Sequence, residues 1–433
     1  MLTAAQRKEK MGAVIRAGSG NFLELYDFLV YAYFANYIGQ AFFPAKGELT
    51  PLLIVLGTYG VASLARPFGA VVLGSYMDRK GRRQGLILTL ALMAVGTVSL
   101  AITPTYATIG ILGPIIITLG RLVQGFSLGV EAGGVNVYLA EIATPSTRGF
   151  YCAWQGSSQA LGAIAATGLG VLLTATLTME QMADWGWRVP LLVGCLIIPV
   201  LFWLMRSLQE TEAFEHSTHA RTTREILRIL LEHWQVVLIG ILLTILNTTM
   251  FYFVNTYTAL YGSLLKLDPF GNFTVALCVG TASFILLPTF GALSDRIGRW
   301  PLLVAAPVLV LLTAYPAMSW LVSAPSFGRL LIVEFWLAIL YAMYAGTLVP
   351  FVVEVMPAKV RSSGYAIILS LANGVFGTFT PFIVTMLIST TGNRASPALW
   401  LSAAAAVSIL TVIAARRVAV RPALQVPAQQ SAS

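Results

Sequence analysis

A short charged motif occurs twice in this chain, about half a chain apart. Residues 74–83 read GSYMDRKGRR, and residues 291–300 read GALSDRIGRW. Each copy lies between long apolar stretches. Internal repeats on this scale indicate a fold built from two similar halves. Halves of this kind joined in the middle of the chain are typical of secondary membrane transporters.

A second pair of charged residues repeats with the same rhythm. Glu141 and Arg148 return as Glu354 and Arg361. The repeat therefore extends beyond a single motif and covers the ends of several apolar segments.

The composition indicates that most of the chain faces lipid. It is 57% hydrophobic and only 10% charged, with a mean hydropathy of +0.79, whereas soluble domains carry roughly 25% charged residues. A spanning helix needs about 20 mostly apolar residues. On this basis we predict twelve spans near residues 20–43, 51–77, 85–103, 109–140, 150–175, 188–208, 234–262, 272–293, 301–322, 329–353, 363–390 and 397–415.

These spans predict an all-α membrane protein with two pseudo-symmetric six-helix bundles. The apolar runs are continuous, as in helices, and do not alternate with period two as in a β-barrel. We expect four parts: an N-terminal bundle (1–208), a cytoplasmic linker (209–233), a C-terminal bundle (234–416) and a disordered cytoplasmic tail (417–433).

The basic residues predict the orientation. With a cytoplasmic N-terminus, 20 of the 27 lysines and arginines fall inside and 5 outside, which is a strong positive-inside bias. Both termini are then cytoplasmic. The net charge of +9 reflects this topology, and we expect no nucleic-acid partner. The first apolar run is too long and too acidic for a cleaved signal peptide.

Charged residues inside the spans are candidates for function, because charge in a bilayer is costly. Glu24 and Asp27 share one face of the first span, and Arg66 and Glu131 lie at comparable depth. Crowding of like charges and burial both favour the neutral form of a carboxyl group. Glu24, Asp27 or Glu131 could therefore carry a proton; alternatively, these acids form a static ion-pair cluster with Arg66.

Arg121 lies deeper, in the middle or outer part of the membrane. Its guanidinium stays charged and offers a planar fork to carboxylates. We predict that it anchors an organic anion, although a structural pair with an acid is the alternative. The repeat places Glu334 at the equivalent position of the second half. Glu334 either takes part in transport or snorkels outward, since it lies close to the start of its span.

Span seven carries several polar residues that need partners or a wet cavity in a bilayer. Either a cavity lining or hydrogen bonds between helices would satisfy them. We predict that the substrate site combines Arg121 with neutral polar side chains from both halves: Asn21, Tyr33, Gln124, Gln155, Asn247, Tyr252 and Asn255.

Other classes of protein find little support. Cys152, Cys195 and Cys278 lack metal-binding spacing, and the histidines lie in or beside one polar loop. We expect no metal and no cofactor. We find no phosphate loop, no hydrolase constellation and no filter-like segment, so neither an enzyme nor an ion channel is favoured.

The repeated Gly-x-x-x-Asp-Arg-x-Gly-Arg block resembles the signature of the major facilitator superfamily. The resemblance covers the whole chain and implies alternating access about a central site. It further implies that the charged motifs form cytoplasmic gates. The gating residues are Asp78, Arg79, Arg82, Arg83, Glu141, Arg148, Asp295, Arg296, Arg299, Glu354 and Arg361.

Four further segments resemble the metabolite–proton symporters. These are GNFLELYDF (20–28), GRLVQGFS (120–127), SLQETEAF (207–214) and SLGVEAGGVNVYL (127–139), which runs on into EIATP (141–145). The last segment, with FYF (251–253), is similar to the citrate and tricarballylate symporters in particular. The departure from the wider family is Val130, where those proteins usually have glycine.

The resemblance implies a bacterial inner-membrane protein that imports a tricarboxylate together with protons. Its partners would be the organic anion, protons and the lipid bilayer, with a monomer sufficient for function. A symporter for another charged metabolite, such as a dicarboxylate or an osmolyte, is the alternative. A drug exporter fits less well, because Arg121 and the polar span seven favour an anion.

Overall fold

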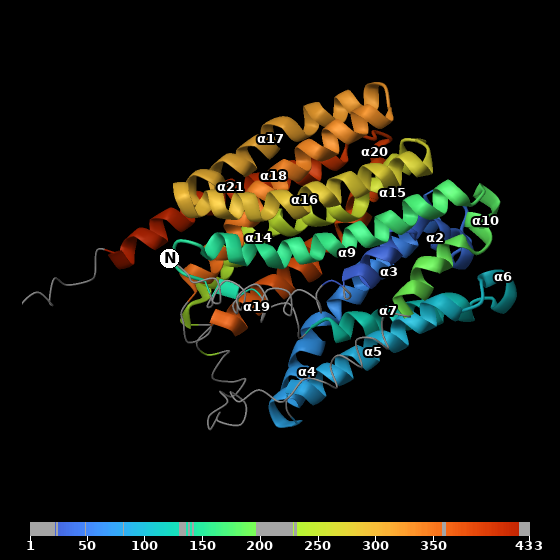
Figure 1. Cartoon of the computed structure of the whole chain (residues 1–433), viewed down its shortest axis with the longest axis horizontal. Coiled ribbons are helices and arrows are strands. Elements are labelled where there is room, and N and C mark those ends of the chain that lie inside the picture. Colours follow the sequence, from blue (N-terminus) through green and yellow to red (C-terminus); the bar gives the residue numbers. More distant parts are fainter. Residues whose placement is uncertain are drawn as a thin grey trace, which may run out of the picture.

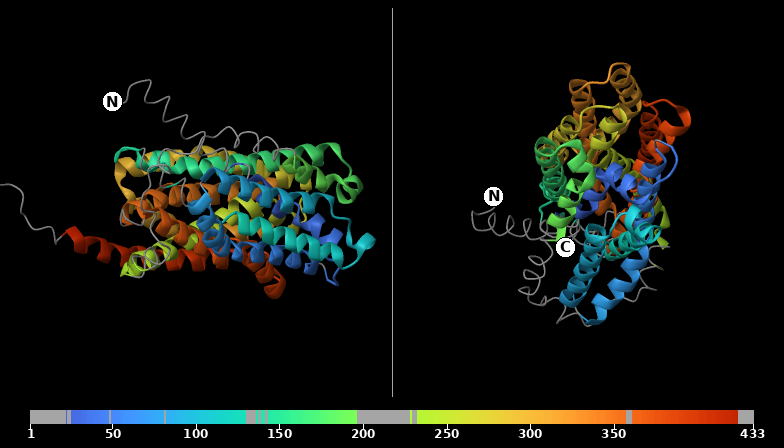
Figure 2. Two further views of the ribbon diagram at one scale, coloured as in Figure 1. Left: turned by 90° about the horizontal axis from the view of Figure 1, so that it is seen from below. Right: turned by 90° about the vertical axis from the view of Figure 1, so that its right-hand side faces the viewer.

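The computed structural model describes residues 25–47, 49–80, 82–129, 139–140, 143–195, 232–356 and 361–423, together with residues 22, 136 and 228. Within these ranges the regular structure is helical. The long helices run close to the long axis of the molecule (Figure 1). Seen end-on, they gather into two groups that follow the two halves of the chain (Figure 2).

The first half begins with a helical segment at residues 25–33. It continues with α2 (Ala35–Phe42), α3 (Thr50–Leu64), α4 (Arg66–Lys80), α5 (Arg82–Ile102), α6 (Tyr106–Ile109), α7 (Leu112–Ser127), α9 (Arg148–Thr176), α10 (Met179–Asp184) and the short η1 (Gly186–Arg188).

The second half contains α14 (Trp234–Tyr252), the π-helix η2 (Phe253–Tyr257), α15 (Thr258–Leu264), α16 (Pro269–Ile297), α17 (Arg299–Ser323), α18 (Phe327–Val355), α19 (Arg361–Ala372), the π-helix η4 (Asn373–Gly377), α20 (Thr380–Thr391) and α21 (Pro397–Ala423).

Local sequence signals explain where these helices begin and end. The Asp268 side chain accepts a hydrogen bond from the backbone N–H of Gly271, and Pro269 follows at the first helical position of α16. The same helix stops at Gly298, whose φ of 88° is strained for any residue with a side chain. The repeated glycine of the charged motif therefore separates α16 from α17.

The predicted spans coincide with helices over most of the described residues, but the predicted span at 51–77 is interrupted at Ala65, and α7 ends at Ser127, within the predicted span at 109–140. Eight helices are long and apolar enough to cross a membrane, and α5 and α7 contain shorter apolar helices. The chain is thus a multi-pass membrane protein. The predicted span at 188–208 is described only up to residue 195, and the linker at 209–233 lies almost wholly outside the described residues.

The C-terminal helix differs from the expected boundary. We predicted a disordered tail from residue 417, but α21 continues to Ala423. The remainder of the predicted tail lies outside the described residues.

The two halves meet most extensively where α9 packs along α16 (Figures 1 and 2). Gly149 and Gly291 allow the two backbones to approach closely at one end of this contact. A Cβ atom at Gly149 would lie 2.4 Å from the carbonyl oxygen of Gly291. Small residues at helix crossings are the usual means of close packing in membranes.

Candidate functional site: a polar cavity between the two halves

A polar cavity lies between the two halves, near the middle of the helices. It encloses about 850 Å³ of space free of protein atoms, part of it open to solvent. Its polar lining residues come from both halves: Arg66, Asn136, Gln155 and Gln159 from the first, and Asn247, Thr248, Tyr252, Tyr341, Tyr365 and Asn373 from the second.

Arg66 is the one charged side chain among the described residues that line this cavity. It begins α4 directly after a break at Ala65, and it is 9% exposed. Its guanidinium carbon lies 4.8 Å from the centre of the Phe28 ring. Its Nε has no hydrogen-bond partner among the described residues. A partly unpaired cation among neutral donors is a site suited to an organic anion.

Arg121 lies behind Phe28 and does not line the cavity in this conformation. It is fully buried on α7, with its guanidinium carbon 4.8 Å from the ring centre of Phe28, 4.3 Å from that of Tyr31 and 5.4 Å from that of Tyr59. The aromatic faces stabilise the cation. Two of its nitrogens, Nε and one terminal nitrogen, nevertheless have no hydrogen-bond partner among the described residues. Both arginines therefore pack against the same ring, Phe28.

Asp27 joins the Arg121 site through Gln124. The Gln124 amide donates to Asp27 Oδ2, and its oxygen accepts from Arg121 at 2.7 Å. Thr97 also donates to Asp27 Oδ2, at 2.8 Å. Asp27 Oδ1 has no partner among the described residues, and the side chain is 4% exposed. Asp27 is thus bonded to neutral donors, and no described contact pairs it with Arg66.

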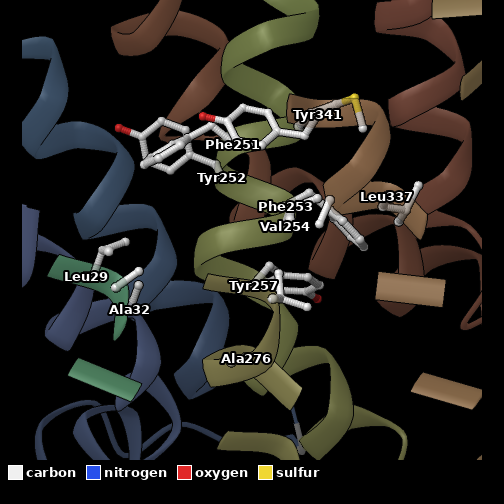
Figure 3. Close-up of a cluster of buried hydrophobic side chains, with 14 of the residues drawn as sticks. Leu29, Ala32, Phe251, Tyr252, Phe253, Val254, Tyr257, Ala276, Leu337 and Tyr341 are labelled. Carbon is white, nitrogen blue, oxygen red and sulfur yellow. The ribbon is translucent and has the colours of Figure 1, made fainter. Parts of the chain in front are cut away.

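The polar residues of span seven that line the cavity precede the π-helix η2. Asn247 and Tyr252 precede it and line the cavity, as predicted from sequence. Asn255 lies within η2 and does not line it; its side chain donates to the backbone oxygen of Phe251. The wider turn changes the face that later residues present. In Figure 3, Tyr252 points toward the first helix and Phe253 toward Leu337 of α18.

A network of charged groups joins the halves at one end of the bundle, hereafter the charged end. The Asp295 carboxylate of α16 accepts from the backbone N–H groups of Gly149 and Phe150, at 2.8 and 3.0 Å. These are free N–H groups at the N-terminus of α9, where the helix dipole favours an anion. Asp295 also pairs with Arg299 at 2.8 Å.

Glu354 completes this network. It pairs with Arg299 at 3.0 Å and with Arg148 of the other half at 3.5 Å. Arg296 is exposed and takes part in no ion pair that the structure describes. Arg361 begins α19, the position in the repeat that Arg148 has in α9.

The opposite end of the bundle is also joined. Tyr33 does not line the cavity; its hydroxyl donates to the backbone oxygen of Asn255 in the other half. The rings of Phe34 and Phe273 lie 5.3 Å apart. The two halves are therefore in contact at both ends of the bundle, and the cavity lies between these two sets of contacts.

Comparison with known proteins identifies the family. Residues 13–227 match the model of the sugar (and other) transporter family. The chain is 46% identical to a citrate–proton symporter of Salmonella typhi over 93% of each chain, and 46% identical to one of Klebsiella pneumoniae over 93% of this chain and 90% of that one. The chain belongs to the metabolite–proton symporter family of the major facilitator superfamily.

The solved structures agree on the fold. The structure of a D-xylose–proton symporter superposes with a TM-score of 0.75, covering 92% of this chain and 95% of that one at 16% identity. The fold is therefore the major facilitator fold of two six-helix bundles.

Several residues predicted for this symporter's site lie outside the described part. They are Asn21, Glu24, Glu131 and Glu141. Asp78, Arg79, Arg82 and Arg83 lie on or beside helices α4 and α5, but their side chains are not among those described. Among the described residues, no group of three His, Cys, Asp or Glu side chains could hold a metal ion.

The sequence did not single out half of the polar cavity lining. Asn136 donates to the hydroxyl of Tyr365 across the cavity at 3.2 Å, and Thr248 donates to the side-chain oxygen of Asn373. Thr248 belongs to the polar span seven noted from the sequence, whereas Asn136, Tyr365 and Asn373 were not singled out. The one available signal was the cost of burying such groups in lipid, which does not reveal the helix face.

We expect Asp295→Asn to weaken the closure of the charged end. Asparagine keeps one acceptor but loses the charge that faces the α9 N-terminus and Arg299. A charge at a helix end contributes about 1–2 kcal/mol, so we expect roughly a 5- to 30-fold shift toward states open at this end. Spin-label distances between exposed positions at the charged ends of the two halves would measure this shift.

Asp184→Asn is the matched control for Asp295→Asn, because it makes the same chemical change at an exposed acid on α10. It should leave the distance distribution as in the wild type. Equal shifts in both variants would mean that general charge, and not the Asp295 contact, controls closure.

Proposed function

We propose that this protein imports a tricarboxylate, citrate or tricarballylate, together with protons by alternating access. The observation that carries the proposal is the central cavity, in which Arg66 faces neutral amides and hydroxyls from both halves. Such a lining provides one strong charge–charge contact and several hydrogen bonds for an anion with many oxygens. The substrate of the 46% identical relatives is citrate, which matches this chemistry.

The second arginine suggests how a multiply charged substrate is held. Arg66 and Arg121 lie on the same aromatic ring, each 4.8 Å from the centre of Phe28. The unpaired nitrogens of Arg121 are buried, and a rotation of Phe28 would open them to the cavity. The substrate would then bridge two guanidinium groups, each able to bind a carboxylate through two N–H groups.

The contacts at the two ends of the bundle provide the gates. The charged end carries the Asp295 network, and the opposite end carries the Tyr33–Asn255 hydrogen bond. We propose that the two sets of contacts break in turn as the halves rock about the cavity. The charged end would face the cytoplasm, as the distribution of basic residues predicts. One chain contains the whole cavity, so a monomer would suffice.

The proton would bind near the arginines. Asp27 Oδ1 has no partner among the described residues, and Gln124 connects Asp27 Oδ2 to Arg121. Protonation of Asp27 would remove a negative charge close to Arg121 and leave that cation free to attract the substrate. Substrate and proton would therefore favour each other's binding. Glu24 and Glu131 are further candidates from the sequence.

Calorimetry on the purified chain would test the substrate class. Citrate and tricarballylate are expected to bind, whereas a neutral sugar and a zwitterionic betaine are expected not to bind. A dicarboxylate should bind more weakly, because it leaves one donor group of the site unpaired. Binding of betaine but not of citrate would favour the alternative of an osmolyte symporter.

We expect Arg121→Lys to reduce citrate affinity by roughly tenfold or more. Lysine keeps the positive charge but loses the planar fork and the stacking against three aromatic rings. The control is Arg228→Gln, at a side chain that is 82% exposed. Wild-type affinity in the Arg121→Lys protein would show that this arginine serves the packing of the first half and not the substrate.

A further inference from the structure

A carboxyl group is buried in the second half without a positive partner. Glu334 lies on α18 and is fully buried, with Leu330, Val333 and Leu337 around it on its own helix. Its Oε2 accepts a hydrogen bond from Thr258 at 3.0 Å. Its Oε1 has no partner, and no ion pair with Glu334 occurs in the part of the chain that the structure describes.

This position rules out one of the two interpretations from sequence. A glutamate that snorkels would extend its carboxylate to the membrane surface, but the Glu334 side chain has no exposed surface. An unpaired carboxylate in an apolar interior is costly, whereas a protonated carboxyl group costs far less. The site is therefore one at which a proton can be held and released.

Polar groups connect Glu334 to a second cavity, hereafter the outer cavity, at the end of the bundle opposite the charged end. Thr258 faces Glu334 from α15, and Tyr261 lies one turn further along the same helix. The Tyr261 hydroxyl donates at 2.7 Å to the backbone oxygen of Arg394. Arg394 lines the outer cavity, together with the polar and charged residues Asn36, Gln40, Ser263 and Lys266.

The same segment carries the gate of the opposite end. Thr258 directly follows the π-helix η2, and within η2 the backbone oxygen of Asn255 accepts the Tyr33 hydroxyl of the other half. Figure 3 shows Tyr257, the residue before Thr258, and Leu337, close to Glu334 on α18, in the same packed cluster. A change in the Glu334–Thr258 bond would therefore act one turn away from the contact between the halves.

We propose that Glu334 is a second proton-binding site, located in the second half, that exchanges its proton with the outer cavity. The proton binds at Oε1, the oxygen without a partner, and the Thr258 hydroxyl holds Oε2 when the proton leaves. The charge that appears on deprotonation strengthens the Thr258 bond and thereby biases the Tyr33–Asn255 gate. This role rests on the proposed proton symport and adds a carrier that is separate from Asp27.

Infrared difference spectroscopy of the full chain tests the site without any substrate. A pH titration in lipid should show the C=O band of a buried protonated carboxyl group disappear as the pH rises. Glu334→Gln should remove one such band, since glutamine has the same shape and still accepts from Thr258. Glu334→Asp keeps a titratable carboxyl group and should retain a band. Glu180→Gln, at an exposed acid on α10, should change no buried band.

Proton counting then links the site to transport. In proteoliposomes, the reversal potential of citrate flux gives the number of protons per citrate, which we expect to fall by one in Glu334→Gln and to stay unchanged in Glu334→Asp and Glu180→Gln. An identical infrared titration in wild type and Glu334→Gln would overturn the proposal, as would an unchanged proton count. If the wild-type protein does not transport citrate but Glu334→Gln still loses a carboxyl band, the proton site is supported and citrate is rejected as the substrate.

Discussion

Replacing Arg66 with glutamine is expected to weaken citrate binding by roughly 100-fold. Arg66 is the charged side chain that faces the central cavity within the described residues. Glutamine keeps hydrogen-bonding groups of similar reach but removes the charge. The loss of a charge-assisted contact in a partly buried site costs about 3 kcal/mol, which corresponds to this factor. Calorimetric titration of the purified protein with citrate would measure it.

Arg228→Gln is the control for Arg66→Gln, because it makes the same chemical change at an exposed position. It should bind citrate with wild-type affinity. If Arg66→Gln also binds as the wild type does, Arg66 is a structural residue and the anion lies elsewhere in the fold.

Replacing Asp27 with asparagine is expected to lower gradient-driven accumulation of citrate by about tenfold per pH unit of gradient, while exchange of citrate continues. Asparagine keeps an oxygen that can accept from Thr97 and Gln124 but cannot take up a proton at this position. A gradient of one pH unit supports about tenfold accumulation for each coupled proton, and this driving force would no longer act through Asp27. Parallel assays of counterflow and of gradient-driven uptake in proteoliposomes separate the two activities.

The matched control for Asp27→Asn is Asp184→Asn, at an exposed acid on α10, which should accumulate citrate normally. Full gradient-driven accumulation by Asp27→Asn would exclude Asp27 as an essential carrier. Glu24 and Glu131, the other acids singled out from the sequence, would then be tested in the same way.

The sequence predicted the helices well because lipid imposes a simple rule. Each span is a long apolar run, and charges or glycines such as Gly298 mark where it ends. Local irregularities within the helices could not be predicted by this rule. The break at Ala65 and the π-helices η2 and η4 depend on packing between helices, which composition does not encode.

The candidate site was predicted only in part, for a related reason. Gln155, Asn247 and Tyr252 line the cavity as expected. Arg121 was selected for its depth in the membrane. Depth does not predict which face of a helix lines the cavity. In the structure, three aromatic rings pack against the Arg121 guanidinium. Arg66 was recognised as a costly buried charge, but its place in the cavity lining could not be predicted from depth alone.

The burial of Glu334 could likewise not be predicted from its position in the span. Its place near the start of a span made an outward-facing carboxylate plausible from sequence. Burial by neighbouring helices and the hydrogen bond from Thr258 became visible only in three dimensions.

The central claim is that proton entry drives the import of a tricarboxylate. The most direct measurement is uptake of labelled citrate into proteoliposomes with an alkaline interior. We predict accumulation above the external concentration that grows with the pH gradient and disappears when a protonophore collapses it. Uptake that stops at equal concentrations whatever the gradient, or accumulation that survives complete collapse of the pH gradient and membrane potential, would contradict the account.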